Sequence, residues 1–150
     1  MRVDQAEIED LPLIVDMKLR MFREVGSYGL LREGAEEMIL QSYAALYREG
    51  LCRHYILRDG AGQAVAIGGA VIKAEVPFCF FQGPGYGYVM DVYTVPEARG
   101  QGHATRIMEA VLAWLKERGV RQVKLKPSGA GRALYGRMGF QDAGEMEKWL

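Results

Sequence analysis

The sequence predicts a single mixed α/β domain, and three observations carry that prediction. Its 150 residues suit one ordinary domain, and a content of 49% hydrophobic and 25% charged residues is typical of a globular chain with one core. Some segments follow a strand pattern and others a helix pattern. The expected order is strand, two helices, three strands, helix, strand, helix, strand, which alternates too irregularly for a doubly wound sheet.

The first 50 residues are expected to hold one short strand and two helices. The strand covers residues 2–6, and the first helix begins near Asp10, a plausible N-cap, with Pro12 tolerated in its first turn. The run Gly26-Ser27-Tyr28-Gly29 breaks that helix. A second helix is expected over residues 33–48, ended by Gly50.

A β-hairpin is expected next. Strands at residues 55–57 and 65–72 flank the turn Asp59-Gly60-Ala61-Gly62, which favours antiparallel pairing. An aromatic stretch with Gly and Pro, residues 77–86, then leads to a strand at residues 88–95 that ends against Pro96.

The most regular helix is predicted over residues 104–115, followed by Gly119 where a C-cap belongs. Its apolar positions follow helical spacing: Ala104, Ile107, Met108, Val111, Leu112 and Leu115. A strand at residues 120–126 completes a βαβ unit, so the strands on either side of this helix should be parallel. A short helix at residues 130–138 and a final strand at residues 140–149 are expected to close the chain.

Charge and composition argue against several classes of function. Nineteen basic and nineteen acidic residues cancel, so no overall field favours nucleic acid or an anionic membrane. The N-terminus has no hydrophobic targeting core, and no apolar run of about 18 residues occurs, so we expect a cytoplasmic protein. Cys52 and Cys79 are interpreted as packing residues, and no second ligand accompanies His54 or His103, so we expect no metal site.

The stretch from Tyr93 to Ala104 is the most informative, because a buried strand there passes through a glycine-bearing turn into a strong helix. Unpaired N–H groups at a helix N-terminus, glycines that let the backbone come close, and the charge of Arg99 are typical of an anion site. A plain strand-to-helix turn with Arg99 in solvent is the alternative. The spacing excludes a P-loop and leaves the dinucleotide pattern incomplete.

At this turn the sequence resembles a known family. Arg99-Gly100-Gln101-Gly102-His103-Ala104 matches the Arg/Gln-x-x-Gly-x-Gly/Ala signature of the GNAT superfamily of acyl-CoA-dependent N-acetyltransferases. Val95-Pro96-Glu97 matches as well, and the run from Leu134 to Phe140 resembles the family's Leu-Tyr-x-x-x-Gly-Phe ending. The resemblance covers essentially the whole chain. It implies one GNAT-like domain over residues 1–150, with a twisted, mostly antiparallel sheet, a splayed parallel strand pair, and acetyl-CoA as co-substrate.

By this resemblance, the cofactor enters between the strand ending at Val95 and the strand around Val123. The backbone of Tyr93 and Val95 is expected to bind the pantetheine arm, and an N–H near Tyr93 to stabilise an oxyanion, a contribution of roughly 3 kcal/mol elsewhere. The pyrophosphate is expected to bind the amides of Arg99, Gly100, Gln101, Gly102, His103, Ala104 and Thr105. Ser128 stands where many relatives carry an asparagine that contacts the pantetheine.

Two side chains are the catalytic candidates. Tyr135 matches the family tyrosine that protonates the departing thiolate, with a core tyrosine as the alternative reading. Asp91 lies two residues before Tyr93 on the cofactor strand, and therefore on the same face, where a family base is often found. A structural hydrogen-bonding role for Asp91 stays open, since the frequent glutamate slightly earlier on this strand is absent.

The acceptor side is expected in residues 21–32 and 76–86, which include Phe22, Tyr28, Arg32, Phe78, Phe80, Phe81 and Tyr86. These aromatic and charged residues favour a small amine or an amino-acid-like acceptor, although they could equally close the core or a homodimer interface. The predicted activity is acetyl transfer from acetyl-CoA to a primary amine by direct attack. The alternative is a GNAT-like module that binds acyl-CoA or a partner without turnover.

Overall fold

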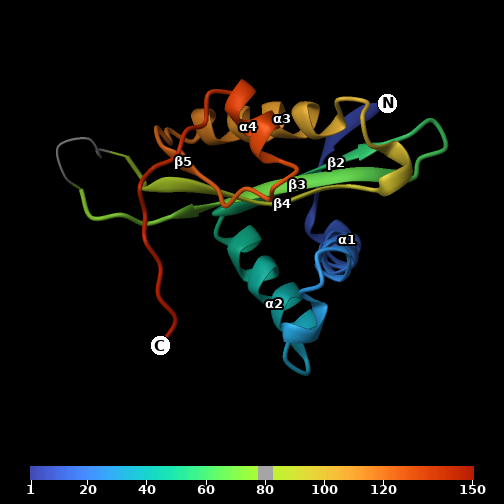
Figure 1. Ribbon diagram of the computed structural model, residues 1–150, viewed down its shortest axis with the longest axis horizontal. Helices are drawn as coiled ribbons and strands as arrows, with labels where there is room; N and C mark the ends of the chain where they lie inside the picture. Colours follow the sequence, from blue (N-terminus) through green and yellow to red (C-terminus); the bar gives the residue numbers. More distant parts are fainter. Residues whose placement is uncertain (78–82) are drawn as a thin grey trace.

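A twisted five-stranded sheet forms the centre of the computed structural model, which describes residues 1–77 and 83–150 (Figure 1). The strands stand in chain order: β1 (Arg2–Gln5), β2 (Cys52–Arg58), β3 (Ala64–Lys73), β4 (Tyr86–Thr94) and β5 (Val123–Lys124). Neighbours from β1 to β4 pair antiparallel, whereas β4 and β5 pair in parallel. The expected mixed sheet, the hairpin and the βαβ unit are confirmed.

Helices cover both faces of the sheet. The helices α1 (Leu11–Glu24) and α2 (Ala35–Arg48) lie on one face, and α3 (His103–Glu117) lies on the other (Figure 1). The short α4 (Arg132–Arg137) follows β5, and single 3-10 turns occupy Ile8–Asp10, Tyr28–Leu30 and Pro96–Ala98. None of the described helices is long and apolar enough to cross a membrane.

The core lies between α3, the sheet and α1. The predicted apolar face of α3 supplies Ile107, Met108, Val111 and Leu115, each at most 1% exposed. Two glycines allow α3 to lie close to the sheet, because a Cβ at Gly68 would stand 2.5 Å from Ile107 Cγ2, and one at Gly87 would stand 2.6 Å from Leu115 Cδ1.

Asp10 occupies the N-cap position of α1, but its side chain does not cap that helix. Its carboxylate instead accepts a hydrogen bond from the Glu7 amide at 2.9 Å and one from Arg58 at 3.3 Å. The preceding 3-10 turn explains the difference, since the carboxylate closes that turn rather than the first turn of α1.

The prediction of a final strand over residues 140–149 is wrong in this chain. The segment joins no strand ladder, and Gly144 takes a left-handed conformation with φ of 73°. Alternating polar and apolar residues form a strand only where a neighbouring edge accepts their hydrogen bonds. Here β5 contributes just two ladder residues, and both pair with β4.

A β-bulge interrupts β4 at Asp91. The register against β3 shifts between the pairs Ile67–Tyr93 and Gly69–Met90. Asp91 is the one described residue other than glycine with positive φ, at 60°. The extra residue turns Met90 and Asp91 toward the same face, because both lie within hydrogen-bonding distance of Tyr43 on α2.

Candidate active site

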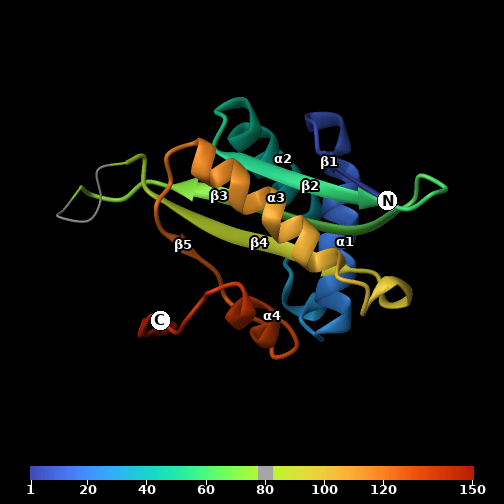
Figure 2. The same cartoon turned by 90° about the horizontal axis from the view of Figure 1, so that it is seen from above.

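A gap opens between β4 and β5 beyond their short ladder. The two strands pair only at Gly87–Val123 and Tyr88–Lys124, and then diverge (Figure 2). A trough of about 1070 Å³ occupies this gap. Its walls are β4 from Val89 onward, the turn before α3, the loop after β5, and α4.

Backbone alternation decides which groups of β4 face the trough. The N–H of Val95 donates to Val65 on β3 at 3.0 Å, and its carbonyl accepts from Ala98 at 3.0 Å. Tyr93, two residues earlier, stands opposite Ile67 in the same ladder. The backbone groups of Val92 and Thr94 therefore point the other way, toward the trough. This geometry differs from the expectation for Tyr93 and Val95 by one residue.

The turn before α3 presents a row of free amides. Gly100 and Gly102 both have φ of 76°, a conformation that suits glycine. The first amide of α3 that finds a carbonyl is that of Arg106, which donates to Gly102 at 3.2 Å. Within the described residues, the N–H groups of residues 100–105 have no acceptor. Together with the helix dipole, they give this end of the trough the polarity that suits an anion.

The side chain of Arg99 points away from these amides. Its Nη2 lies 2.5 Å from the Glu24 carboxylate at the end of α1, and its Nε donates to the Thr94 carbonyl at 2.9 Å. Glu24 also accepts from the Tyr93 hydroxyl at 2.5 Å. The hydrogen bonds from Tyr93 and Arg99 lower the pKa of Glu24, so this carboxylate is ionised and ties α1 to the turn.

His103 and Gln101 differ in their relation to the trough. His103, the first residue of α3, lines the trough but is only 5% exposed, and neither ring nitrogen has a described partner. Gln101 is exposed and is absent from the trough lining. The backbone rather than the side chain of Gln101 is thus the group available to a ligand.

Ser128 and Tyr135 lie on the opposite wall. Ser128 Oγ accepts from the Gly131 amide at 3.1 Å, so this hydroxyl helps to start α4. Tyr135 is half-buried, packs edge-on against Phe140 at 5.9 Å between ring centroids, and has a pKa raised by burial. Gly131 makes room for this ring, because a Cβ there would stand 2.9 Å from Tyr135 Cε2.

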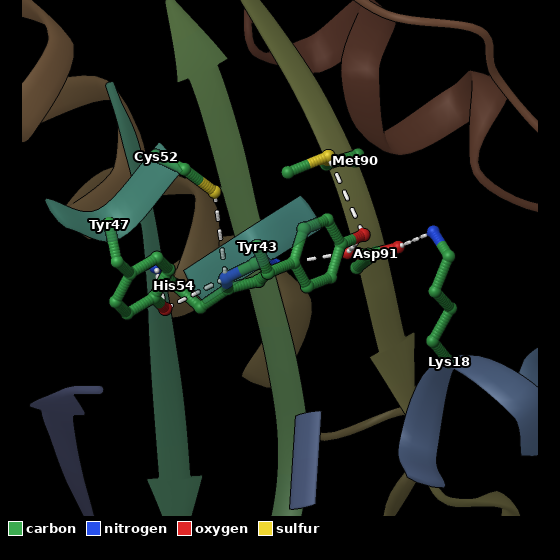
Figure 3. A network of polar contacts seen from close by, with 7 residues as sticks. All are labelled: Lys18, Tyr43, Tyr47, Cys52, His54, Met90 and Asp91. Atoms are coloured by element: carbon green, nitrogen blue, oxygen red, sulfur yellow. Dashed lines mark hydrogen bonds and ion pairs between the residues drawn. The ribbon is translucent and has the colours of Figure 1, made fainter. Parts of the chain in front are cut away.

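Asp91 is the centre of a buried polar network (Figure 3). Its Oδ1 accepts from Lys18 Nζ at 2.5 Å, and its Oδ2 accepts from Tyr43 at 2.5 Å and from His54 Nε2 at 2.9 Å. The Asp91 side chain has no exposed surface, and that of Lys18 is 15% exposed. The network therefore joins α1, α2, β2 and the bulge in β4.

Tyr47 fixes the orientation of the His54 ring. The Tyr47 hydroxyl accepts the His54 backbone N–H at 3.1 Å and lies 2.9 Å from Nδ1. When Nε2 carries the ring proton and donates it to Asp91, Nδ1 of a neutral imidazole accepts the Tyr47 hydroxyl proton. Burial alone would raise the pKa of Asp91, but the hydrogen bond from His54 and the Lys18 ammonium hold it well below its usual range.

The expected acceptor segments lie only partly at the trough. Met21, Phe22 and Glu24 line it, whereas Tyr28 and Arg32 line a separate cavity of about 570 Å³ between α1 and α2. Phe78, Cys79, Phe80 and Phe81 lie outside the described residues. Burial raises the pKa of the Cys52 thiol to about 12, in keeping with a packing role. Across residues 1–77 and 83–150 no cluster suited to a metal ion occurs.

Comparisons with known proteins agree with this arrangement. Residues 18–140 match the model of the acetyltransferase (GNAT) family. The chain belongs to the GNAT acetyltransferase family. No curated protein matches the sequence significantly.

Solved GNAT structures share the whole fold. A predicted acetyltransferase from Clostridium acetobutylicum, solved with acetyl-CoA, has a TM-score of 0.88 at 22% identity, covering 99% of this chain and 95% of its own. A GCN5-related N-acetyltransferase from Ralstonia eutropha has a TM-score of 0.88 at 24% sequence identity, and the match covers 99% of this chain and 97% of that one. Glucosamine-6-phosphate N-acetyltransferase from Arabidopsis thaliana has a TM-score of 0.71 at 19% sequence identity, and the match covers 99% of this chain and 97% of that one.

Several residues of this GNAT site escaped the sequence analysis. The directions of the Val92 and Thr94 backbone N–H groups depend on the register against β3, which is invisible in the sequence. Lys18, Tyr43 and His54 lie 37 to 73 positions from Asp91, and nothing in the local pattern links them. The position of Lys18 between Met17 and Leu19 on an amphipathic helix was the one available signal.

Proposed function

We propose that this chain transfers an acetyl group from acetyl-CoA to a primary amine of a small molecule or peptide. One observation carries the proposal: a single trough joins the free amides at the start of α3 to the Tyr135 side chain. An anion held at one end thereby places the rest of an extended ligand along β4.

The residues at the trough fit acetyl-CoA. The amides of Gly100, Gly102, His103, Ala104 and Thr105, with that of Gln101, would hold the pyrophosphate. Backbone groups of Val92 and Thr94 would bind the pantetheine amides in the manner of an added strand, with Tyr93 and Val95 supporting them from the β3 side. Ser128 keeps its hydroxyl proton available for the same arm.

Tyr135 is the proposed general acid. The acceptor nitrogen attacks the thioester carbon, the new N–C bond forms, and the C–S bond breaks. Tyr135 then gives its proton to the departing thiolate, whose basicity is close to that of a phenol, and the proton lost by the attacking nitrogen returns to the tyrosinate through water. Burial raises the pKa of Tyr135, so the hydroxyl is protonated at neutral pH and is able to donate.

Asp91 is less suitable as the general base than water in the trough. Each of its oxygens already accepts at least one hydrogen bond, and its pKa is held low by His54 and Lys18. A carboxylate stabilised in this way takes a proton poorly near neutral pH. We assign Asp91 to positioning of the bulge and infer that the proton of the acceptor ammonium leaves through water in the trough.

The acceptor is proposed to enter between Met21, Phe22 and Met90, which give the trough an apolar side near Asp91. We also propose that the chain forms a homodimer, because two-fold dimers are the commonest assemblies. A catalytically inactive acyl-CoA-binding module would share the amides of the turn, but it would have no use for a tyrosine hydroxyl at position 135 in the wall of the trough.

Thiol release from acetyl-CoA, measured across a panel of small amines, amino acids and N-terminal peptides, tests the activity. Calorimetry with CoA alone accompanies it. We expect CoA binding and release with at least one acceptor. Binding without release across the panel would favour the inactive module, and failure to bind CoA would overturn the assignment of residues 100–105.

A further inference from the structure

The backbone of the turn between β4 and α3 does not hold itself in place. Gly100 and Gly102 both have φ of 76°, and glycine loses more conformational freedom on ordering than any other residue. The N–H groups of residues 100–105 donate to no acceptor within the described chain. Donors that are already ordered bind an anion more tightly than donors that must first be ordered. The affinity for an anion at this turn therefore depends on the contacts that fix the turn.

The side chain of Arg99, immediately before the first of these glycines, makes such contacts. Its Nε donates to the Thr94 carbonyl at 2.9 Å, across the intervening 3-10 turn, and its Nη2 lies 2.5 Å from the Glu24 carboxylate. The Arg99 guanidinium also lies 5.7 Å from the centroid of the Tyr93 ring. Arg99 thus attaches the start of the turn to β4 and to α1.

Glu24, the last residue of α1, closes this set of contacts. One of its carboxylate oxygens accepts from the Tyr93 hydroxyl and the other from Arg99, each at 2.5 Å. The helix reaches the turn from the face of the sheet opposite α3 (Figure 1). These hydrogen bonds lower the pKa of Glu24, and Glu24 raises the pKa of Arg99, so both groups are charged at neutral pH. A carboxylate 75 positions from Arg99 therefore helps to determine where the turn lies.

A carboxylate is an unexpected neighbour for an anion site, because its charge repels the ligand. Glu24 could hold Arg99 and the turn in place, or it could keep Arg99 away from the phosphates of a ligand. The contacts of Arg99 favour the first role. Moving its side chain to a phosphate would break the bond to the Thr94 carbonyl and the ion pair together, and would leave the ionised Glu24 without its cation.

We propose that Glu24 is a positioning residue for acyl-CoA: through Arg99 and Tyr93 it fixes the turn whose amides hold the cofactor phosphates, and it raises cofactor affinity despite its negative charge. The inference rests on the proposed acyl-CoA site and adds the residue that organises it. Because α1 also carries Met21 and Phe22 at the trough, one helix then supports both the cofactor turn and the acceptor side.

Glu24→Gln tests the proposal by the sign of its effect. The amide keeps the size of the side chain but removes the charge and leaves one acceptor oxygen for two donors. The Arg99 and Glu24 side chains are 49% and 35% exposed, so the variant should fold. We expect CoA affinity, measured by calorimetry, to fall roughly 5- to 10-fold, the scale of a charge-assisted pair at such a site. In thiol release, KM for acetyl-CoA should rise by a similar factor, and by more than kcat falls.

Glu97→Gln is the matched control. Glu97 lies exposed in the same turn, and its carboxylate also favours the charged form of Arg99, but Arg99 forms its ion pair with Glu24. This variant removes the same charge and only a repulsion, so CoA affinity should stay the same or rise. A Glu24→Gln chain that binds CoA as tightly as the natural chain, or more tightly, would overturn the positioning role alone. A natural chain that does not bind CoA would overturn the proposed function as well.

A double-mutant cycle shows whether Glu24 acts through Arg99. Arg99→Gln alone should weaken CoA binding, and adding Glu24→Gln to it should weaken binding by less than about 2-fold further, because the contact is already lost. Thermal unfolding confirms that each variant is folded before its affinity is measured. Losses that simply multiply in the double variant would contradict an action of Glu24 through Arg99 and would overturn the proposal.

Discussion

The Lys18 ammonium lies 2.5 Å from the Asp91 carboxylate, and this buried pair fixes the β-bulge of β4 to α1. Lys18 Nζ also stands 5.2 Å and 5.6 Å from the ring centroids of Phe22 and Tyr43. Removing one charge from such a pair leaves the other charge buried without a partner. The resulting loss of stability is larger than the stability that the intact pair adds relative to apolar side chains.

Asp91→Asn should destabilise the fold by about 3 kcal/mol, because Lys18 loses its counter-charge. Asparagine tolerates positive φ, so the bulge itself adds little strain. Urea unfolding at pH 7 measures the change. Lys18→Met combined with Asp91→Asn should recover part of the loss, since no unpaired charge then remains.

The matched control is Asp16→Asn, which breaks the exposed pair of Asp16 and Arg20 at 2.9 Å on the same helix. It should cost less than about 0.5 kcal/mol. Equal losses at Asp16 and Asp91 would contradict the importance assigned to burial.

The free energy of unfolding should also depend on pH through Asp91. Its folded pKa is depressed, so its contribution is fully present above the unfolded value of about 3.9 and declines as the pH falls toward the folded value. The gap in stability between the natural chain and Asp91→Asn should therefore shrink below about pH 4. Unfolding curves from pH 7 to pH 3 give this gap directly, and a gap that widens on acidification would be incompatible with the buried ion pair.

The pH profile of turnover distinguishes positioning from proton removal at Asp91. If Asp91 only positions the bulge, Asp91→Asn lowers kcat but leaves the apparent pKa values of kcat/KM in place. If it removes the proton from the acceptor, the acid limb of the profile moves or disappears. We expect the first result, measured by thiol release over pH 5 to 9 with the best acceptor found.

Local patterns predicted most of the fold, and the failures share one physical cause. The spacing of Ile107, Met108, Val111 and Leu115 places α3, and the turn at Asp59 places the β2–β3 hairpin through hydrogen bonds from Ala61 and Gln63. The prediction of the final strand failed because strand pairing is a property of two segments rather than one. The Asp10 carboxylate likewise pairs with other segments, the 3-10 turn at Glu7 and Arg58 of β2, in place of the first turn of α1.

At the candidate site, too, local features were predicted, and contacts between distant segments were not. The glycine turn and Tyr135 were predicted because their chemistry is written in contiguous residues, and both line one trough. Arg99 was expected to face phosphate, but its partner Glu24 lies 75 positions away and could not be foreseen. The direction of the Val92 and Thr94 backbone groups follows from a β3 register that only the folded sheet reveals, and cofactor binding by the backbone of Tyr93 and Val95 stays a prediction.

Tyr135→Phe should lower turnover by about 100-fold or more while CoA affinity stays within a few-fold of the natural value. The substitution removes one hydroxyl, and general acid catalysis typically contributes at least this factor. Packing against Phe140 is retained, because the ring is unchanged. Steady-state kinetics and calorimetry measure the two quantities. Tyr55→Phe on β2 is the control and should alter neither; unchanged turnover in Tyr135→Phe would remove the tyrosine from the mechanism.

Gly102→Asp should abolish CoA binding, and Gly34→Asp should not. The two glycines are closely matched: each is the N-cap of a long helix, with φ of 76° and 77°, and neither has an atom within 4 Å of a built Cβ. Backbone strain and loss of stability should therefore be similar in both variants. Only Gly102→Asp places a carboxylate beside the free amides of residues 100–105, where it would occupy the anion site and repel a phosphate. Calorimetry with CoA gives the comparison; equal affinity in both variants would mean that the start of α3 does not hold the cofactor.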